Sequence, residues 1–486
     1  MFRGASIPGS TAFPDRVGGS SRRIDVLCDG SETDVSDIDA DLVVIGFGKG
    51  GKTLAATLGR QGKRVVMIER SNRMYGGTCI NIGCVPTKSM VFAAEEALGH
   101  PRDPAMYTAA VHRTAELTAS LREQNYAMLD SIPGVDVLTG TATFLDAHTV
   151  SVQTDDGVVT VEGHHIVVGT GSEPVWPSIP GLQGNPRAMT STELLATDQL
   201  PSRLVVLGGG YVGLEFAAMC AAYGAHVTLL ERQPAVLSRE DDDVAAVAAK
   251  LLEEAGVHIV CAADVTSIDE STVHYRVGAR ETSVEADGIL VALGRRPVTS
   301  GLNLEAASIA IRDDGTIAVD EHLRTSQPHI FAVGDVNGGP QFTYVSLDDY
   351  RVVLDQLNGN GSRTTSDRVA VPYTLFMTPP LARVGLTERQ AREAGGAIKV
   401  AALPVAKMAT VPRARIVHRP AGLMKVVVDA DTDEILGAAL LSYDSHEVIN
   451  TVALAMRHGI TATTLRDSIY THPSMTEAFN QLLGML

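Results

Sequence analysis

Two stretches of this chain repeat one pattern: an apolar run, a glycine-rich turn, a helical stretch and a second apolar run that ends in an acid. The stretches span 41–69 and 204–231, and each acid follows the first glycine of its turn by 23 positions. In a dinucleotide-binding unit the first glycine makes the tight turn, the second admits a pyrophosphate, the third packs helix on strand, and the acid bonds ribose hydroxyls. The residues in these places are Gly46, Gly48, Gly51 and Glu69, and then Gly208, Gly210, Gly213 and Glu231. The pattern predicts an α/β protein with two Rossmann-like domains that bind two nucleotides.

A glycine-rich segment after the first copy, 76–88, holds Cys79 and Cys84 five positions apart. On a regular helix such positions point about 140° away from each other, so a disulfide between them needs a distorted turn. Strained, exposed disulfides are the labile, catalytic kind. We expect Pro86 to bend any helix begun there, and a helix start to favour the thiolate form of a cysteine. A zinc site would need further cysteines or paired histidines, and two inert cysteines would not explain the glycines. The segment therefore predicts a redox pair.

Residues 76–88, GGTCINIGCVPTK, resemble the active-site segment of the class I pyridine nucleotide–disulfide oxidoreductases. That family includes dihydrolipoyl dehydrogenase, glutathione reductase and mercuric reductase, and the likeness covers about residues 40–486. The T-C-I-N-I-G-C sequence is most similar to that of the bacterial reactive-chlorine-resistance flavoproteins, which are described as hypothiocyanous acid reductases with reported copper-reductase activity. The resemblance implies that Cys84 lies next to a flavin and that Cys79 is the interchange thiol that attacks substrate.

Two nucleotide folds beside one redox pair are most simply assigned to FAD at the first fold and a nicotinamide at the second. Glu231 can bond a free ribose 2′-OH and would repel a 2′-phosphate, which favours NADH. Arg232 and Arg239 are close enough in sequence to keep NADPH open. Segments 166–172, 291–297 and 325–335 also resemble the family, although Gly169 replaces its usual alanine. The resemblance implies further cofactor-binding residues: Lys88, Gly171 and Asp335 for FAD, with Asp335 on the ribityl chain, and Gly294 for NAD.

The C-terminal part resembles the family's dimerisation domain from about residue 372. His472 and Glu477 lie on either side of a proline turn, where the carboxylate can orient the imidazole as a base. In the family this pair reaches the partner subunit's disulfide, which implies a homodimer with an active site shared between chains. The expected architecture is a disordered extension (1–40), an FAD-binding domain (41–165 and 288–366), an NAD(P)-binding domain (166–287) and a C-terminal α+β dimerisation domain (367–486).

The net charge and the number of cysteines limit the partners and the cellular compartment that we expect. A net charge of −17 argues against a nucleic-acid partner and an anionic membrane surface, and no apolar run is long enough to span a bilayer. Five scattered cysteines do not form a secreted disulfide framework, so the cytoplasm is expected and no metal site is predicted. Cys28 receives no role, whereas Cys220 and Cys261 are interpreted as core residues.

The runs 412–415 and 444–447 resemble the chlorine-resistance proteins. For His446 in the second run, an interface position is favoured over contact with substrate or metal.

The expected mechanism is a relay from NADH through FAD and the Cys79–Cys84 disulfide to a small oxidant, with the partner's His472 exchanging the proton at Cys79. Hypothiocyanous acid or a related reactive chlorine species is the favoured oxidant. Dihydrolipoyl dehydrogenase is the second hypothesis, because His472, Glu477 and Glu231 suit it equally. Mercuric or copper(II) reduction is the third, although the C-terminal cysteine pair of mercuric reductases is not found after Cys261. Glutathione reductase would favour basic residues in place of Glu231, and a non-catalytic flavoprotein would be expected to lose one of the reactive residues.

Overall fold

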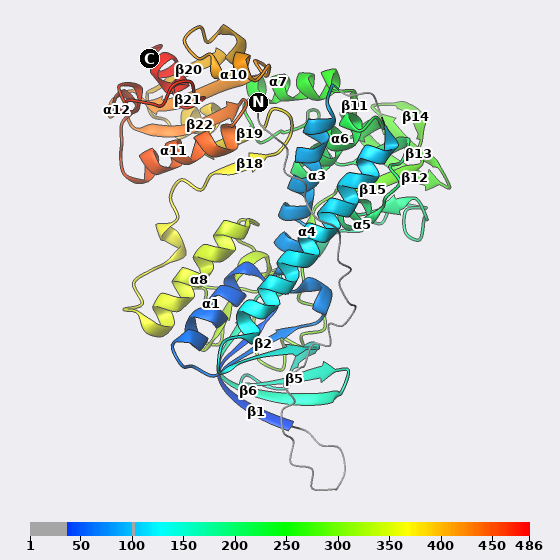
Figure 1. Ribbon diagram of the computed structural model, residues 1–486, viewed down its shortest axis with the longest axis vertical. Coiled ribbons are helices and arrows are strands. Elements are labelled where there is room, and N and C mark those ends of the chain that lie inside the picture. Colours follow the sequence, from blue (N-terminus) through cyan, green and yellow to red (C-terminus); the bar gives the residue numbers. More distant parts are fainter. Residues whose placement is uncertain (1–35, 100–102) are drawn as a thin grey trace, which may run out of the picture.

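The computed structural model describes residues 36–99 and 103–486. Residues 1–35 of the predicted extension, including Cys28, lie outside the described residues. The last residues of that segment, 36–40, belong to the first strand, β1 (Ser36–Ile45), which is longer than the apolar run 41–45 suggested. The sheets form three bodies, and Figure 1 shows long helices between the first and the second and an extended segment that leads to the third.

The first body is built on a mixed sheet that carries the first glycine turn. Strand β6 pairs in parallel with β1 along its length, in parallel with β17 at its end and antiparallel with β5 at its start. The order continues through β2 to β3 on one side and through β5 to β4 on the other. The strands are β2 (Val65–Glu69), β3 (Val135–Thr139), β4 (Thr141–Phe144), β5 (Thr149–Thr154), β6 (Gly157–Val168) and β17 (Ile330–Ala332).

Strand β1 buries both of its faces, as expected for a parallel strand covered on two sides. Leu42 and Val44 pack in one core with helices α1 (Lys49–Arg60) and α8 (Thr343–Asn358). Val43 and Ile45 pack in a second core with the antiparallel strands and the segment 302–317. The glycine turn therefore lies at the carboxyl end of β1, where ligands bind in open α/β sheets.

The second body repeats this arrangement around the second glycine turn. Its parallel sheet has the order β11-β10-β9-β15-β8, and the predicted strands at 204–207 and 226–230 are β9 and β10. A three-stranded antiparallel sheet, β12-β13-β14, adjoins it (Figure 1). The elements are β8 (Ala188–Met189), α5 (Ser191–Ala196), β9 (Arg203–Leu207), α6 (Tyr211–Ala222), β10 (His226–Leu230), α7 (Asp242–Glu254), β11 (Val257–Val260), β12 (Ala263–Asp269), β13 (Thr272–Val277), β14 (Arg280–Glu285) and β15 (Gly288–Val291).

Two helices connect the bodies. Helix α3 (Cys84–Ala97) packs against α4 (Pro104–Asp130) and against α6 of the second body, through a core that includes Met90, Tyr107 and Phe216. Figure 1 shows α4 running from the first body to the second. The same core includes Cys220, which is fully buried as predicted, with Cys261 packed at its edge. Because α3 begins at Cys84, this packing fixes the cysteine between the two nucleotide folds.

The third body is an antiparallel sheet of order β18-β19-β22-β21-β20 with helices around it. Buried ion pairs attach it to the second body: Arg383 bonds Glu240 at 3.0 Å, and Lys425 bonds Asp241 at 3.3 Å. Among residues 36–99 and 103–486, no helix is long and apolar enough to cross a membrane. The elements are β18 (Tyr373–Leu375), β19 (Leu381–Gly385), α9 (Glu388–Glu393), β20 (Ile398–Pro404), α10 (Arg413–Ile416), β21 (Leu423–Asp429), β22 (Ile435–Leu441), α11 (Ser445–Arg457), α12 (Ala462–Arg466) and α13 (Ala478–Leu483).

Candidate active site

The two cysteines lie on consecutive helices with a break between them. Cys79 is in the short helix α2 (Gly77–Asn81), and Cys84 is the first residue of α3. The chain leaves helical geometry at Gly83, whose φ and ψ are −127° and −115°. This interruption confirms that one regular helix does not carry both sulfurs. The expected bend at Pro86 is wrong: the proline is in the first turn of α3, where its missing N–H is not needed, and the helix continues to Ala97.

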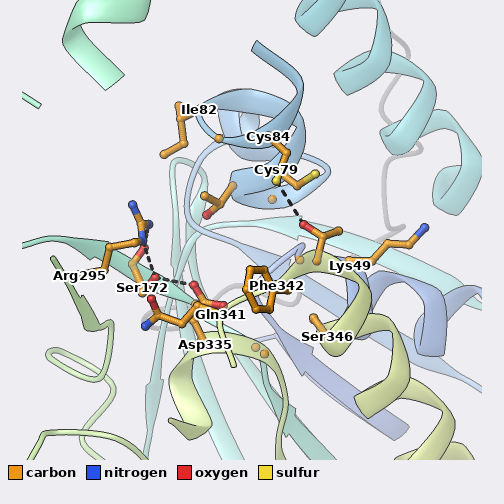
Figure 2. Close-up of a pocket in the computed structure, with 18 of the residues that line it drawn as sticks. Lys49, Cys79, Ile82, Cys84, Ser172, Arg295, Asp335, Gln341, Phe342 and Ser346 are labelled. Atoms are coloured by element: carbon orange, nitrogen blue, oxygen red, sulfur yellow. Dashed lines mark hydrogen bonds between the residues drawn. The ribbon is translucent and has the colours of Figure 1, made fainter. Parts of the chain in front are cut away.

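The sulfurs of Cys79 and Cys84 face each other as free thiols (Figure 2). The hydrogen bond from Cys79 lowers the pKa of Cys84, and Thr343 and Lys88 lower it further. The Thr343 hydroxyl lies 3.5 Å from the Cys84 sulfur. The hydrogen bond to Cys84, together with burial, raises the pKa of Cys79. The first proton lost by the reduced pair therefore leaves a thiolate on Cys84 and a thiol on Cys79.

A partly buried ion pair lies one turn beyond Cys84 on α3. Lys88 Nζ is 2.6 Å from Glu215 Oε2, and the backbone N–H of Phe376 donates to Glu215 Oε1 at 2.9 Å. The Lys88 ammonium also lies 4.8 Å from the centre of the Phe376 ring. Glu215 is on α6 and Phe376 follows β18, so this cluster ties the active-site helix to both other bodies.

A cavity of about 1310 Å³ opens beside the cysteines. It is large enough for a dinucleotide, and its wall contains every residue that the sequence assigns to FAD as well as both sulfurs. These residues are Gly46, Gly48, Gly51, Glu69, Lys88, Gly171 and Asp335. The fold therefore brings these residues together, from distant parts of the chain, in the wall of one continuous cavity.

The glycines of the first turn fit their predicted tasks. A Cβ on Gly46 would lie 2.4 Å from the carbonyl oxygen of Gly169, and a Cβ on Gly51 would lie 2.7 Å from Val44 Cγ1. A Cβ on Gly48 would lie 3.6 Å from the Gly169 carbonyl oxygen, which is an ordinary van der Waals contact, so protein packing does not require a glycine here. The first and third glycines are thus required by protein packing, while the second leaves room for a ligand. The residues present fit FAD.

The second glycine turn repeats this geometry. A Cβ on Gly208 would lie 2.6 Å from the Ala292 carbonyl oxygen and one on Gly213 would lie 2.0 Å from the Gly208 carbonyl oxygen, whereas Gly210 faces open space. Glu231 accepts the N–H of Gly209 at 2.6 Å, just as Glu69 accepts the N–H of Phe47 at 3.0 Å. The residues assigned to NAD lie outside the wall of the large cavity, which the start of α6 reaches through Tyr211.

Asp335 is held by the two segments that resemble the family's domain crossings. Ser172 Oγ donates to Asp335 Oδ2 at 2.5 Å and accepts from Arg295 Nε at 2.8 Å (Figure 2). These segments pair as strands β7 (Ser172–Pro174) and β16 (Arg295–Pro297). Gly171 and Gly294 have φ values of +73° and +108°, which side-chain-bearing residues rarely adopt. The crossings therefore position the carboxylate of Asp335 at the cavity.

His472 and Glu477 form the predicted pair but lie away from the cysteines of the same chain. His472 Nδ1 is 2.8 Å from Glu477 Oε2, and Glu477 Oε1 also accepts the N–H of Ser474 at 3.0 Å. The histidine side chain is 66% exposed, and neither residue lines the cavity. Within one protomer, the structure therefore brings Cys79 and Cys84 together but leaves the imidazole on the surface of the third body.

Several cavity residues were missed by the sequence analysis, among them Thr343, Glu215, Phe376, Arg295 and Ser172. Nothing in the sequence around Thr343 signals that it meets Cys84, which is 259 positions away. His446 also lines the cavity, and its ring lies 5.5 Å from that of Phe376. The two unassigned runs meet, because Arg413 pairs with Asp444 at 3.4 Å. Among the described residues, no group of three or more potential metal ligands is found.

Two protein-family models match the chain. The model described as pyridine nucleotide-disulphide oxidoreductase matches residues 40–349, and the model described as the dimerisation domain of these oxidoreductases matches residues 371–483. Together they account for most of the described chain.

The individual proteins to which this chain is similar are oxidoreductases of the same kind. The probable pyridine nucleotide-disulfide oxidoreductase RclA of Escherichia coli is 46% identical, over 91% of this chain and 98% of the relative. A mercuric reductase of Staphylococcus aureus is 33% identical, over 91% of this chain and 81% of the relative. A dihydrolipoyl dehydrogenase of Geobacillus stearothermophilus is 31% identical, over 90% and 94%. The solved Cu(II) complex of the HOCl-induced flavoprotein disulfide reductase RclA from E. coli matches with a TM-score of 0.87 and 45% identity, over 92% of this chain and 99% of that one.

Proposed function

Because the chain belongs to the pyridine nucleotide–disulphide oxidoreductase family, we propose that it reduces hypothiocyanous acid or a related reactive chlorine species with electrons from NADH. Members of this family are enzymes that use FAD and NAD(P)H, and this chain is such an oxidoreductase. The observation that carries the proposal is the Cys79–Cys84 pair, two free thiols with opposite pKa shifts at the wall of the dinucleotide-sized cavity.

In the reduced state, different residues of the chain bind the cofactor, hold the thiolate and meet the substrate. FAD bound in the cavity would supply the redox chemistry that couples NADH oxidation to reduction of the cysteine pair. Asp335 and Glu69 would bond its sugar hydroxyls, and the turn at Gly48 would face its pyrophosphate. Cys84 holds the more stable thiolate, beside Thr343 and one turn before Lys88. Cys79 is then left as the sulfur that meets substrate.

The substrate step follows from the chemistry of an electrophilic sulfur. The Cys79 thiolate attacks the sulfur of hypothiocyanous acid, the S–O bond breaks, and the oxygen leaves as water after taking a proton. Cys84 then attacks the Cys79 sulfur, which forms the disulfide and expels thiocyanate. His472 of the partner subunit would supply and recover the proton at Cys79, with its ring oriented by Glu477. Two thiols are oxidised and one oxidant is reduced by two electrons.

The choice of oxidant is supported by the relative that is described as an HOCl-induced flavoprotein disulfide reductase. The dimerisation domain supports a homodimer. We place the protein in the cytoplasm, because its five scattered cysteines do not form the disulfide framework of a secreted protein. Reduction of lipoamide is the second candidate, because the His472–Glu477 pair can exchange protons with any interchange thiol.

Steady-state NADH oxidation by the purified flavoprotein tests the proposal, with hypothiocyanous acid, lipoamide, Cu(II) and Hg(II) compared in parallel. We expect fast turnover with hypothiocyanous acid. The variant Cys79→Ser should lower this turnover by at least about a thousandfold, because an alcohol cannot take part in the disulfide. Cys261→Ser is the matched control, since that thiol lies outside the cavity, and it should retain wild-type turnover. Fast turnover with lipoamide alone would contradict the proposed oxidant.

A further inference from the structure

Lys52 is a lysine inside the protein without a carboxylate beside it. It lies in the first turn of α1 and is 6% exposed. Its Nζ donates to the neutral side-chain oxygen of Asn125 on α4. The ionisable groups that act on its charge are Lys49 and Cys79, and no carboxylate of the described residues is among them. A buried charge without an ion partner destabilises a fold, so this residue requires an explanation.

Asn125, the hydrogen-bond partner of the amine, packs against the turn that precedes α2, the helix that carries Cys79. A Cβ on Gly76 would approach the Asn125 side-chain carbon to 3.3 Å, and a Cβ on Gly77 would lie 2.8 Å from Gly48 Cα. The turn that precedes α2 is therefore packed directly onto the start of α1 and onto the partner of the Lys52 amine. Cys79 is the third residue of α2.

Of the described groups that act on the charge of Lys52, Cys79 is the one that can become an anion. Lys49 on the same helix repels that charge, and burial lowers the pKa of Lys52 to about 8. On α4, Asn125 accepts a hydrogen bond from the amine, whereas Arg122 donates to Asn81 at the end of α2 at 3.1 Å. On α8, the neutral Ser346 packs against the start of α1, where its hydroxyl accepts the N–H of Gly50. With a pKa of about 8, Lys52 is mostly an ammonium at neutral pH.

We propose that Lys52 is a positioning residue for Cys79, whose buried ammonium stabilises the thiolate that Cys79 must form in order to attack substrate. The inference rests on the proposed function in one respect, namely that Cys79 is the attacking sulfur. Cys79 needs this stabilisation because of how the protons are distributed over the Cys79–Cys84 pair. The resting proton arrangement favours the thiolate on Cys84, so Cys79 has to be deprotonated against its raised pKa, and the charge of Lys52 lowers that pKa. A pyrophosphate at the N-terminus of α1 would add negative charge near the amine and keep it protonated.

Alkylation kinetics separate this role from a structural one. The flavoprotein with Cys84→Ser leaves one thiol of the pair, and the rate of its reaction with iodoacetamide across pH reports the pKa of Cys79. In this background Lys52→Met should raise the apparent pKa of Cys79 by about one unit, which slows alkylation at neutral pH about tenfold. Lys52→Arg should restore most of the rate, because it keeps the charge. Lys49→Met is the matched control one turn away on the same helix, and we expect it to change the rate less than about twofold.

A second variant distinguishes the charge from the hydrogen bond. Lys52→Gln keeps a donor for Asn125 without the charge, so it should slow alkylation as Lys52→Met does. Wild-type alkylation in either neutral variant, with the flavin spectrum intact, would overturn the proposal, as would an equal effect of Lys49→Met. The measurement needs neither NADH nor an oxidant. A wrong choice of oxidant would therefore leave its result unchanged, and a failure here would leave the oxidant test standing.

Discussion

At the scale of single residues, Lys52 destabilises the fold in which it is buried. Its pKa in the folded chain is about 8, against 10.5 for an exposed lysine, because burial disfavours the ammonium. Between these two pH values the unfolded chain holds a proton that the folded chain has lost, so stability rises with pH across this window. The full penalty applies below pH 8 and amounts to roughly 3 kcal/mol.

Replacing Lys52 by methionine should therefore stabilise the protein. We expect Lys52→Met to raise the free energy of unfolding by roughly 1–3 kcal/mol near neutral pH, since an apolar chain replaces an unpaired charge. The gain should vanish as the pH rises to about 10.5, where both forms of the lysine are neutral. Urea unfolding of both proteins across this pH range measures the difference. Lys63→Met, at a half-exposed lysine paired with Asp41, is the control and should show no such pH-dependent gain. A constant difference at every pH would contradict this origin.

Residues that act within one short segment could be predicted from the sequence, and residues that act across the fold could not. Cys79 and Cys84 are five positions apart, so helix geometry alone required the break that Gly83 provides. Thr343 meets Cys84 from 259 positions away, and nothing in either segment signals the contact. Lys52 was missed for another reason: its place in a glycine turn suggests an exposed or phosphate-facing lysine, and its burial depends on α4 packing over it.

At the scale of elements, the two strand–turn–helix units use their acids in the same way. Glu69 accepts the N–H groups of Phe47 and Ser71, and Glu231 accepts those of Gly209 and Gln233. Each carboxylate thus holds its glycine turn against the end of the next strand. The repeated spacing in the sequence predicted this equivalence, because both the turn and the acid are local to the unit.

The Glu231 carboxylate can accept further hydrogen bonds besides those from its own turn. A bond to the ribose of the nicotinamide cofactor should make it decide between NADH and NADPH. We expect Glu231→Ala to raise the KM for NADH by about 5–50-fold, because a charge-assisted bond to the ribose is lost. The KM for NADPH should change much less or fall, because the repulsion of a 2′-phosphate is removed. Steady-state kinetics with both cofactors provide the measurement, and Glu253→Ala, on the exposed side of α7, is the control. An equal rise in both KM values would assign Glu231 to the turn alone.

At the scale of the whole molecule, the third body is firmly attached yet directs its reactive pair outward. The ion pairs of Arg383 with Glu240 and of Lys425 with Asp241 join this body to the second one, and all four side chains are buried. They resist a swing of this body that would carry His472 to the cysteines of its own chain, because breaking a buried pair is strongly destabilising. Ile469, three positions before His472 in the chain, is a fully exposed apolar residue, which suits a surface that another chain covers. The sequence predicted the His472–Glu477 contact, but its distance from the cavity emerges only from the packing of three bodies.

Co-expression of two inactive chains should restore activity if the site is shared. A Cys79→Ser chain keeps His472, and a His472→Ala chain keeps both cysteines. In a mixed dimer, one site therefore combines intact cysteines with an intact His472, and the other site lacks both Cys79 and His472. In a two-fold dimer with random pairing, half of the molecules are mixed and each has one working site of two. We therefore expect about a quarter of wild-type NADH oxidation from the mixture, and about half from mixed dimers isolated by two affinity tags. Mixing the two purified homodimers without subunit exchange is the control and should give only the sum of their residual rates. If the isolated mixed dimers also gave only that sum, His472 would act within its own chain or not at all.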